Sequence, residues 1–167
     1  PKNTMNATYW DTAYGEKETN DYTAAVRIGR DAQFNYYVQP VLHERLEFPA
    51  LVKRAGDIRQ TYATQVKVER RASGKSLVQT LLKVGIPAME LEPGGMDKIA
   101  RAHSVTEWFA TRKVFFVKHP LLSDLEDELL RFPSGKHDDL VDALVMGLRD
   151  LTTYASDAKV RSRGGFN

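Results

Sequence analysis

The order of strand-like and helix-like segments constrains the fold of this 167-residue chain more than any other feature. Three segments rich in β-branched and aromatic residues come first, and shorter strand-like segments then alternate with segments of helical periodicity. The expected strands are residues 5–10, 22–28, 34–42, 65–69, 86–91 and 114–117, and the expected helices are 49–62, 73–82, 96–111, 121–130 and 138–154. This order predicts an α/β fold in which a mixed β-sheet of about five or more strands is flanked by helices.

Turn residues and apolar runs add detail to this prediction. Gly29-Arg30-Asp31 predicts a short hairpin connection, and Val114-Phe115-Phe116-Val117 predicts a fully buried strand. No repeat and no linker divides the chain, so residues 1–154 are expected to form one domain. Residues 155–167 end in Arg-Ser-Arg-Gly-Gly-Phe-Asn and are expected to be a flexible, basic tail.

Composition limits the kinds of metal site and location that are expected. Cysteine is absent, which leaves oxygen and imidazole ligands for any metal. The 24 Lys and Arg residues against 22 Asp and Glu residues give a net charge of only +2, so net charge does not indicate a nucleic-acid partner. No apolar run approaches the roughly 20 residues that span a bilayer, and no export signal is visible. A cytoplasmic protein with no membrane partner is therefore expected.

The segment from Lys136 to Val145 carries the most specific signal in the chain. Asp142 lies within an otherwise apolar helical segment, three residues after Asp139. Capping of a helix N-terminus explains an acidic residue such as Asp138, but it does not explain Asp142. Residues three apart share a helix face, where two carboxylates repel each other unless a cation lies between them. This segment therefore favours a metal site.

Two more acidic residues lie at the ends of expected strands. Asp11 ends the first strand and Glu69 ends the strand 65–69. Taken alone, Asp11 is better explained as a turn residue and Glu69 as an exposed edge charge paired with a nearby arginine. Together with Asp139 they predict one site that binds Mg²⁺ or Mn²⁺ through oxygen. Two such ions roughly 3.5–4 Å apart catalyse phosphodiester hydrolysis in many enzymes. His137 is a further candidate, either as a ligand or water-positioning residue or as a helix-capping or surface residue.

The loop after Glu69 is basic and rich in small residues. Ser73-Gly74-Lys75-Ser76 is not a P-loop, because Glu69 occupies the place where that motif requires its first glycine. Arg70, Arg71 and Lys75 instead predict a DNA-phosphate contact at a helix N-terminus beside the metal site. A solvated basic loop is the alternative.

Asp11, Glu69 and the segment His137-Asp138-Asp139-Leu140-Val141-Asp142-Ala143 together resemble the nuclease domain of phage terminase large subunits. The helical run of residues 125–133, shortly before His-Asp-Asp, is similar to that family as well, and the resemblance covers about residues 5–152. It implies an RNase H-like fold, shared with RuvC-type Holliday junction resolvases. It also implies the roles of the acidic residues: Asp11, Glu69 and Asp139 as catalytic metal ligands, Asp142 as a further ligand, and Asp138, His137 and Asp21 in support.

The resemblance implies an endonuclease that cuts concatemeric double-stranded DNA during viral packaging by a mechanism with two metal ions. It implies as partners duplex DNA, an ATPase domain of the same longer chain, the small terminase subunit and the portal, all within an infected or prophage-bearing cell. The sequence shows no ATPase segment, so it is expected to be an excised domain or the C-terminal part of a longer protein. Two alternatives stay open: a RuvC-type junction resolvase, and a non-catalytic RNase H-like module that binds DNA or a portal.

Overall fold

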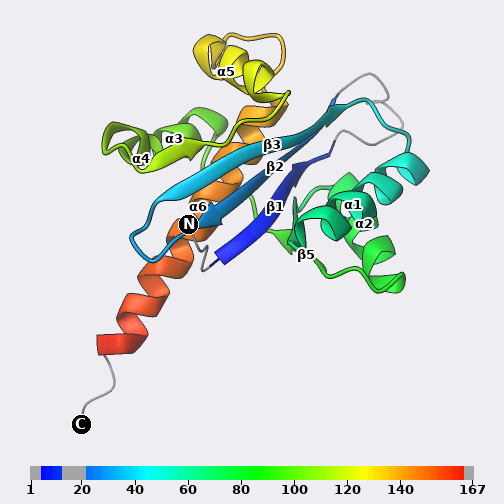
Figure 1. Cartoon of the computed structure of the whole chain (residues 1–167), viewed down its shortest axis with the longest axis horizontal. Helices are drawn as coiled ribbons and strands as arrows, with labels where there is room; N and C mark the ends of the chain where they lie inside the picture. Colours follow the sequence, from blue (N-terminus) through cyan, green and yellow to red (C-terminus); the bar gives the residue numbers. More distant parts are fainter. Residues whose placement is uncertain (1–4, 13–21, 164–167) are drawn as a thin grey trace.

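A mixed six-stranded sheet forms the centre of the molecule in the computed structural model, which describes residues 5–12 and 22–163 (Figure 1). The strand order is β5-β4-β1-β2-β3-β6. β2 is antiparallel to both β1 and β3, whereas β4, β5 and β6 each run parallel to the neighbour they join. The expected α/β fold with a mixed sheet is thereby confirmed. The strands are β1 (Met5–Asp11), β2 (Thr23–Arg30), β3 (Tyr36–Glu44), β4 (Gln65–Glu69), β5 (Ala88–Leu91) and β6 (Val114–Phe116).

Helices cover both faces of this sheet and divide its core into two apolar clusters. One cluster joins the face that carries Tyr9 and Val26 to the long helix α6, and the other joins the face that carries Trp10 and Val68 to α1 and α2. Figure 1 shows α6 crossing the sheet obliquely, with α5 beside its N-terminal end. The helices are α1 (Phe48–Tyr62), α2 (Ala72–Lys83), α3 (Lys98–His103), α4 (Thr106–Ala110), α5 (Leu122–Arg131) and α6 (Asp139–Arg163).

Gly147 lets α6 lie close against the sheet. A Cβ atom at this position would come within 2.6 Å of side-chain carbons of both Tyr9 and Ile28, so a larger residue would push the helix away. The same helix carries Asp139 and Asp142 in its first turn, and its packing on β1 and β2 therefore fixes where these carboxylates lie. None of the helices in the described ranges combines the length and apolar character needed to cross a membrane.

Three details of the sequence-based prediction are wrong. The helix expected at 96–111 is interrupted, because the chain turns at Ser104-Val105 and places Val105 in the core. The strand expected to be buried is the edge strand β6, where Phe115 stacks on Tyr37 and stays 45% exposed. The hairpin turn lies at 31–35 rather than at Gly29-Arg30-Asp31, because the carboxylate of Asp31 accepts hydrogen bonds from the backbone of that turn.

Helix α6 extends past residue 154, where the domain is expected to end. It continues to Arg163, so the backbone of residues 155–163 is helical, and the flexible basic tail of residues 155–167 stays a prediction. Residues 155–163 contain no proline and no glycine, and nothing in their backbone chemistry ends a helix before Gly164.

Candidate metal centre at the ends of β1 and β4

Asp11 and Glu69 end two neighbouring parallel strands. The register of β1 and β4 pairs Trp10 with Val68, so each acidic residue comes one position after the last registered pair. Both side chains point to the sheet face that α6 covers, since each alternates with a neighbour that points to the α1 and α2 side. The two residues are 8% and 6% exposed, respectively. The strand ends thus place two carboxylates side by side under helix α6.

Asp139 and Asp142 approach these carboxylates from the first turn of α6. Burial, the largest cause, raises the pKa of Asp11 from 3.8 to about 7, and the nearby Arg71 guanidinium opposes this rise. The carboxylates of Asp142, Glu69 and Asp139 raise the pKa of Asp11 further. The other three predicted ligands therefore all lie within electrostatic range of Asp11. Burial also raises the pKa of Asp139 and of Asp142.

Side-chain cations neutralise much of this acidic cluster. Lys98 Nζ lies 2.5 Å from Asp138 Oδ2 and 2.7 Å from Asp142 Oδ2. Glu69 pairs with two guanidinium groups: Arg101 Nη1 at 2.6 Å from Oε1 and Arg71 Nε at 2.8 Å from Oε2. The cluster thus already binds positive charge, and its buried carboxylate oxygens are the ligands that Mg²⁺ and Mn²⁺ prefer. The residues present fit a hard divalent cation.

The basic residues predicted after Glu69 take different positions. Arg71 lies beside the acidic cluster, whereas the Arg70 guanidinium pairs with Glu90, at 3.3 Å, and with Glu92. Lys75 is exposed on the first turn of α2, and the described part of the chain holds no carboxylate within ion-pair distance of it. The basic loop therefore presents Lys75 to solvent while Arg70 is neutralised by its own neighbours. The role of all three in DNA binding stays a prediction.

The predicted supporting residues are only partly described. Asp138 takes part in the Lys98 ion pair, and its carbonyl oxygen accepts a hydrogen bond from Asp142 N at 2.8 Å. The His137 ring contacts the Tyr22 ring edge-on, with 5.2 Å between centroids. Asp21 lies outside the described residues.

His43 and Glu128 are the residues that sequence reasoning missed. His43 lies on β3 in the row Asp11–Ala24–His43 that crosses three strands. A bulge between Ala25 and Val26 shifts the register so that Val26 faces Pro40, and His43 thereby faces α6. Ligand atoms of His43, Glu128 and Asp139 all lie within 4.8 Å of one another. No periodicity in the sequence indicates a bulge, and Glu128 reads as part of an acidic surface helix.

A cavity of about 350 Å³ adjoins the cluster on the side of Glu69. Arg101 and Arg149 line it together with Glu69 and Asp150. Asp150 Oδ2 accepts hydrogen bonds from Lys67 Nζ at 2.5 Å and from Tyr9 Oη at 2.8 Å. Arg101 donates to Glu69, and Arg149 Nη1 donates to the carbonyl oxygen of Pro93 at 3.2 Å.

Comparisons with known proteins agree with this geometry. The family model "Terminase RNaseH-like domain" matches residues 8–151. No curated protein matches the chain.

Solved structures share the fold at low sequence identity. The human cytomegalovirus terminase nuclease domain, soaked with manganese, is 12% identical, with a TM-score of 0.54 over 85% of this chain and 80% of that chain. The large terminase nuclease of the thermophilic phage G20c, with bound zinc, is 18% identical, with a TM-score of 0.61 over 85% and 78%. The yeast mitochondrial Holliday junction resolvase Ydc2 is 13% identical, with a TM-score of 0.54 over 87% and 77%.

The match confirms the expected RNase H-like fold and extends over most of the chain, including the four predicted ligands. The chain therefore belongs to the family of terminase RNaseH-like domains and is a metal-dependent nuclease of that family.

Proposed function

We propose that this domain cuts concatemeric double-stranded DNA as the nuclease part of a viral DNA-packaging terminase large subunit, with Asp11, Glu69 and Asp139 as its catalytic metal ligands. One observation carries the proposal: carboxylates from β4 and α6 lie close enough to the buried Asp11 of β1 that, after burial itself, they raise its pKa further. A stable fold does not need this arrangement, because buried like charges cost free energy unless a cation compensates them. Asp142 is the fourth proposed ligand.

The chain's own residues would divide the work as follows. Asp11, Glu69 and Asp139 hold Mg²⁺ or Mn²⁺, which as two ions would activate a water molecule and stabilise the leaving oxygen of the phosphodiester. Arg71 and Arg101 hold the Glu69 carboxylate in place from both sides. The proposed site is rigid, since two of its ligands end strands of the central sheet.

The proposed substrate contact is with the DNA backbone. Lys75 and Arg71 at the start of α2 would bind phosphates. Phosphate contacts carry no base information, so the choice of cutting site would depend on partners. We propose as partners the ATPase domain of a longer chain, the small terminase subunit and the portal.

Plasmid cleavage tests this function. Supercoiled plasmid is incubated with wild-type protein and Mn²⁺, Mg²⁺ or EDTA, beside Asp11→Asn, Asp139→Asn and the control Asp127→Asn, whose carboxylate is 70% exposed on α5. Cleavage should need the metal, fall by more than about 100-fold in the first two variants and persist in the control. Equal activity in all variants would contradict the assigned site. Absence of cleavage by folded wild-type protein would favour a non-catalytic DNA- or portal-binding module.

A junction resolvase is the second candidate, favoured by the fold shared with the yeast enzyme. Competition between a linear duplex and a four-way junction separates the two functions. A terminase nuclease should cut both at similar rates, whereas a resolvase should prefer the junction and form a stable dimer.

A further inference from the structure

His43 and Glu128 lie beside the acidic cluster but belong to no role described so far. His43 Nε2 and Glu128 Oε1 are 3.4 Å apart, and neither atom has a hydrogen-bond partner among the described residues. Glu128 is 7% exposed and the His43 side chain is 12% exposed. Buried polar atoms without partners are rare because each costs free energy, so two that face each other point to a missing ligand.

Helix capping explains only one half of the Glu128 carboxylate. Its Oε2 accepts hydrogen bonds from the backbone N–H groups of Leu140, at 2.9 Å, and Val141, at 3.1 Å. These bonds fix the carboxylate at the N-terminus of α6 and leave Oε1 directed at His43. Capping therefore accounts for the position of Glu128 but not for the unpartnered Oε1.

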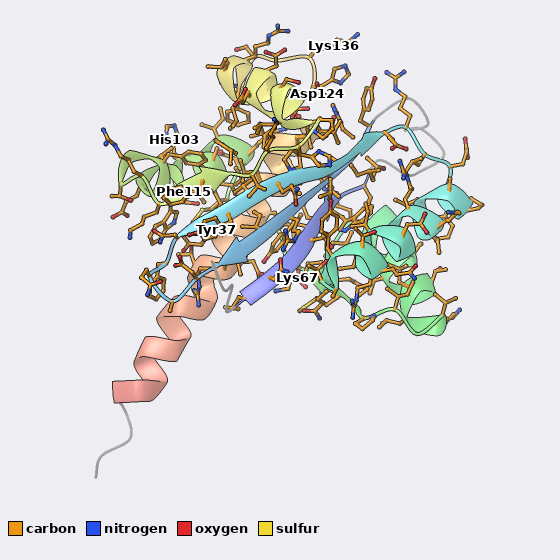
Figure 2. All side chains as sticks on the ribbon, viewed as in Figure 1. Tyr37, Lys67, His103, Phe115, Asp124 and Lys136 are labelled. Atoms are coloured by element: carbon orange, nitrogen blue, oxygen red, sulfur yellow. The ribbon has the colours of Figure 1, made fainter. Side chains whose placement is uncertain are left out.

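The surroundings of His43 resemble those of a metal-bound imidazole. Its other ring nitrogen, Nδ1, faces Asp124 Oδ2 at 3.8 Å, and Asp124 extends from α5 (Figure 2). Metal-binding histidines commonly direct their second nitrogen to a carboxylate, which orients the ring and makes the first nitrogen a better ligand. The bulge in β2 and β3 turns the His43 ring toward α6. A histidine with only a surface role would not require this change of direction.

We propose that His43 Nε2, Glu128 Oε1 and a carboxylate oxygen of Asp139 form a second cation site, next to the one that Asp11 and Glu69 provide. His43 Nε2 and Glu128 Oε1 are 3.4 Å apart, and one ligand atom from each of the three residues lies within 4.8 Å of the other two. Three protein ligands leave positions for water or a phosphate oxygen. The imidazole ligand favours Mn²⁺ or Zn²⁺ over Mg²⁺, which keeps to oxygen ligands and near-ideal octahedral geometry. The inference rests on the proposed nuclease centre only through the shared residue Asp139.

Mn²⁺ itself is the probe for this site. Pulsed electron paramagnetic resonance detects nitrogen bound to Mn²⁺, and none of the ligands proposed for the first site contains nitrogen. The wild-type protein should bind one Mn²⁺ ion more than His43→Asn does and show imidazole nitrogen coupling. Asp11→Asn should keep the coupling, because it alters only the first site. His43→Asn should lose the coupling, and its Mn²⁺ affinity at one site should fall by more than about tenfold.

Two further variants control for folding and for other histidines. In Glu128→Gln the amide oxygen still accepts hydrogen bonds from the backbone N–H groups of Leu140 and Val141, so the helix cap persists. The amide nitrogen is a hydrogen-bond donor and does not bind a cation. The nitrogen coupling should therefore weaken while the protein stays folded. His103→Asn, on the exposed surface of α3, should leave the coupling unchanged (Figure 2). Nitrogen coupling that survives His43→Asn and disappears in His137→Asn would overturn the proposal.

The outcome is separable from that of the proposed function. Metal-dependent DNA cleavage without nitrogen coupling would contradict the second cation site and leave the nuclease assignment intact. Nitrogen coupling in a protein that cuts no DNA would leave the second site intact and remove the nuclease assignment.

Discussion

Asp11 and Glu69 lie side by side at the ends of two parallel strands, one residue beyond the pair Trp10 and Val68, with their carboxylates almost completely buried. Arg71 and Arg101 compensate Glu69, but Asp11 has three carboxylates around it and, within the described residues, only the Arg71 guanidinium to oppose them. Because of this imbalance, the ionisation of Asp11 should affect the stability of the protein, which can be measured without any DNA.

The metal-free protein should lose stability as pH rises from about 4 to 7. The pKa of Asp11 is raised from 3.8 to about 7, first by burial and then by its neighbouring carboxylates. Below pH 4 both the folded and the unfolded chain hold the proton, and above it the unfolded chain releases its proton first, which favours unfolding. A rise of this size corresponds to about 4 kcal/mol at most. Chemical unfolding in EDTA at pH 5 and pH 8 measures the loss, and Asp11→Asn should show a smaller one. Equal losses in the two proteins would contradict the burial of an ionisable Asp11.

Divalent cations should reverse this loss through mass action. Mn²⁺ at 100 times its Kd stabilises a folded protein by about 2.7 kcal/mol when it binds only the folded state. Thermal unfolding with and without millimolar Mn²⁺ should show a clear rise in Tm for the wild-type protein and a smaller rise for Asp139→Asn. An unchanged wild-type Tm would count against the metal site.

Gly74→Ala should disturb the site without altering any charged residue. A Cβ atom at position 74 would lie 2.2 Å from the carbonyl oxygen of Glu69, so the start of α2 or the end of β4 must move. We expect a loss of about 1–3 kcal/mol in the free energy of unfolding and a fall in cleavage. Gly95→Ala is the matched control, because a Cβ atom there meets no atom within 4 Å. If both variants had the stability and cleavage rate of the wild type, the close packing of α2 against Glu69 would contribute to neither.

The two surface cations of the α2 loop should differ in DNA binding. Arg70 is paired with Glu90 and Glu92, whereas Lys75 is exposed and has no ion-pair partner within the described ranges. Lys75→Ala should weaken duplex binding and reduce the slope of log affinity against log salt by about 1, and Arg70→Ala should change both much less. Fluorescence anisotropy at several salt concentrations measures this. A larger effect of Arg70→Ala would mean that DNA displaces its acidic partners.

Much of the fold could be predicted because its strongest elements are locally determined. The strand Gln65–Glu69 alternates apolar and polar residues, and its predicted bounds agree with β4. The position of Asp142 inside an apolar helical segment is enough, from the sequence alone, to indicate the acidic cluster. The exposure of the edge strand β6 could not be predicted, because the apolar run from Val114 to Val117 looks the same whether a neighbouring strand covers it or not.

The rest of the site depends on contacts between distant segments. His43 reaches the cluster only because a bulge in β2 and β3 reverses the direction of its side chain. Glu128 reaches it because α5 packs against the start of α6, twelve residues later in the chain. Lys98 and Arg101 come from α3, whose placement beside α6 no local pattern encodes.

Anomalous diffraction from Mn²⁺-soaked crystals tests most directly whether Asp11, Glu69, Asp139 and Asp142 bind divalent cations. We expect an anomalous peak within ligand distance of the Asp11 and Asp139 carboxylates in the wild-type protein, and its loss in Asp11→Asn. Mn²⁺ bound only elsewhere on the surface, with the ion pairs of Lys98 and Arg101 unchanged, would contradict the proposed metal centre.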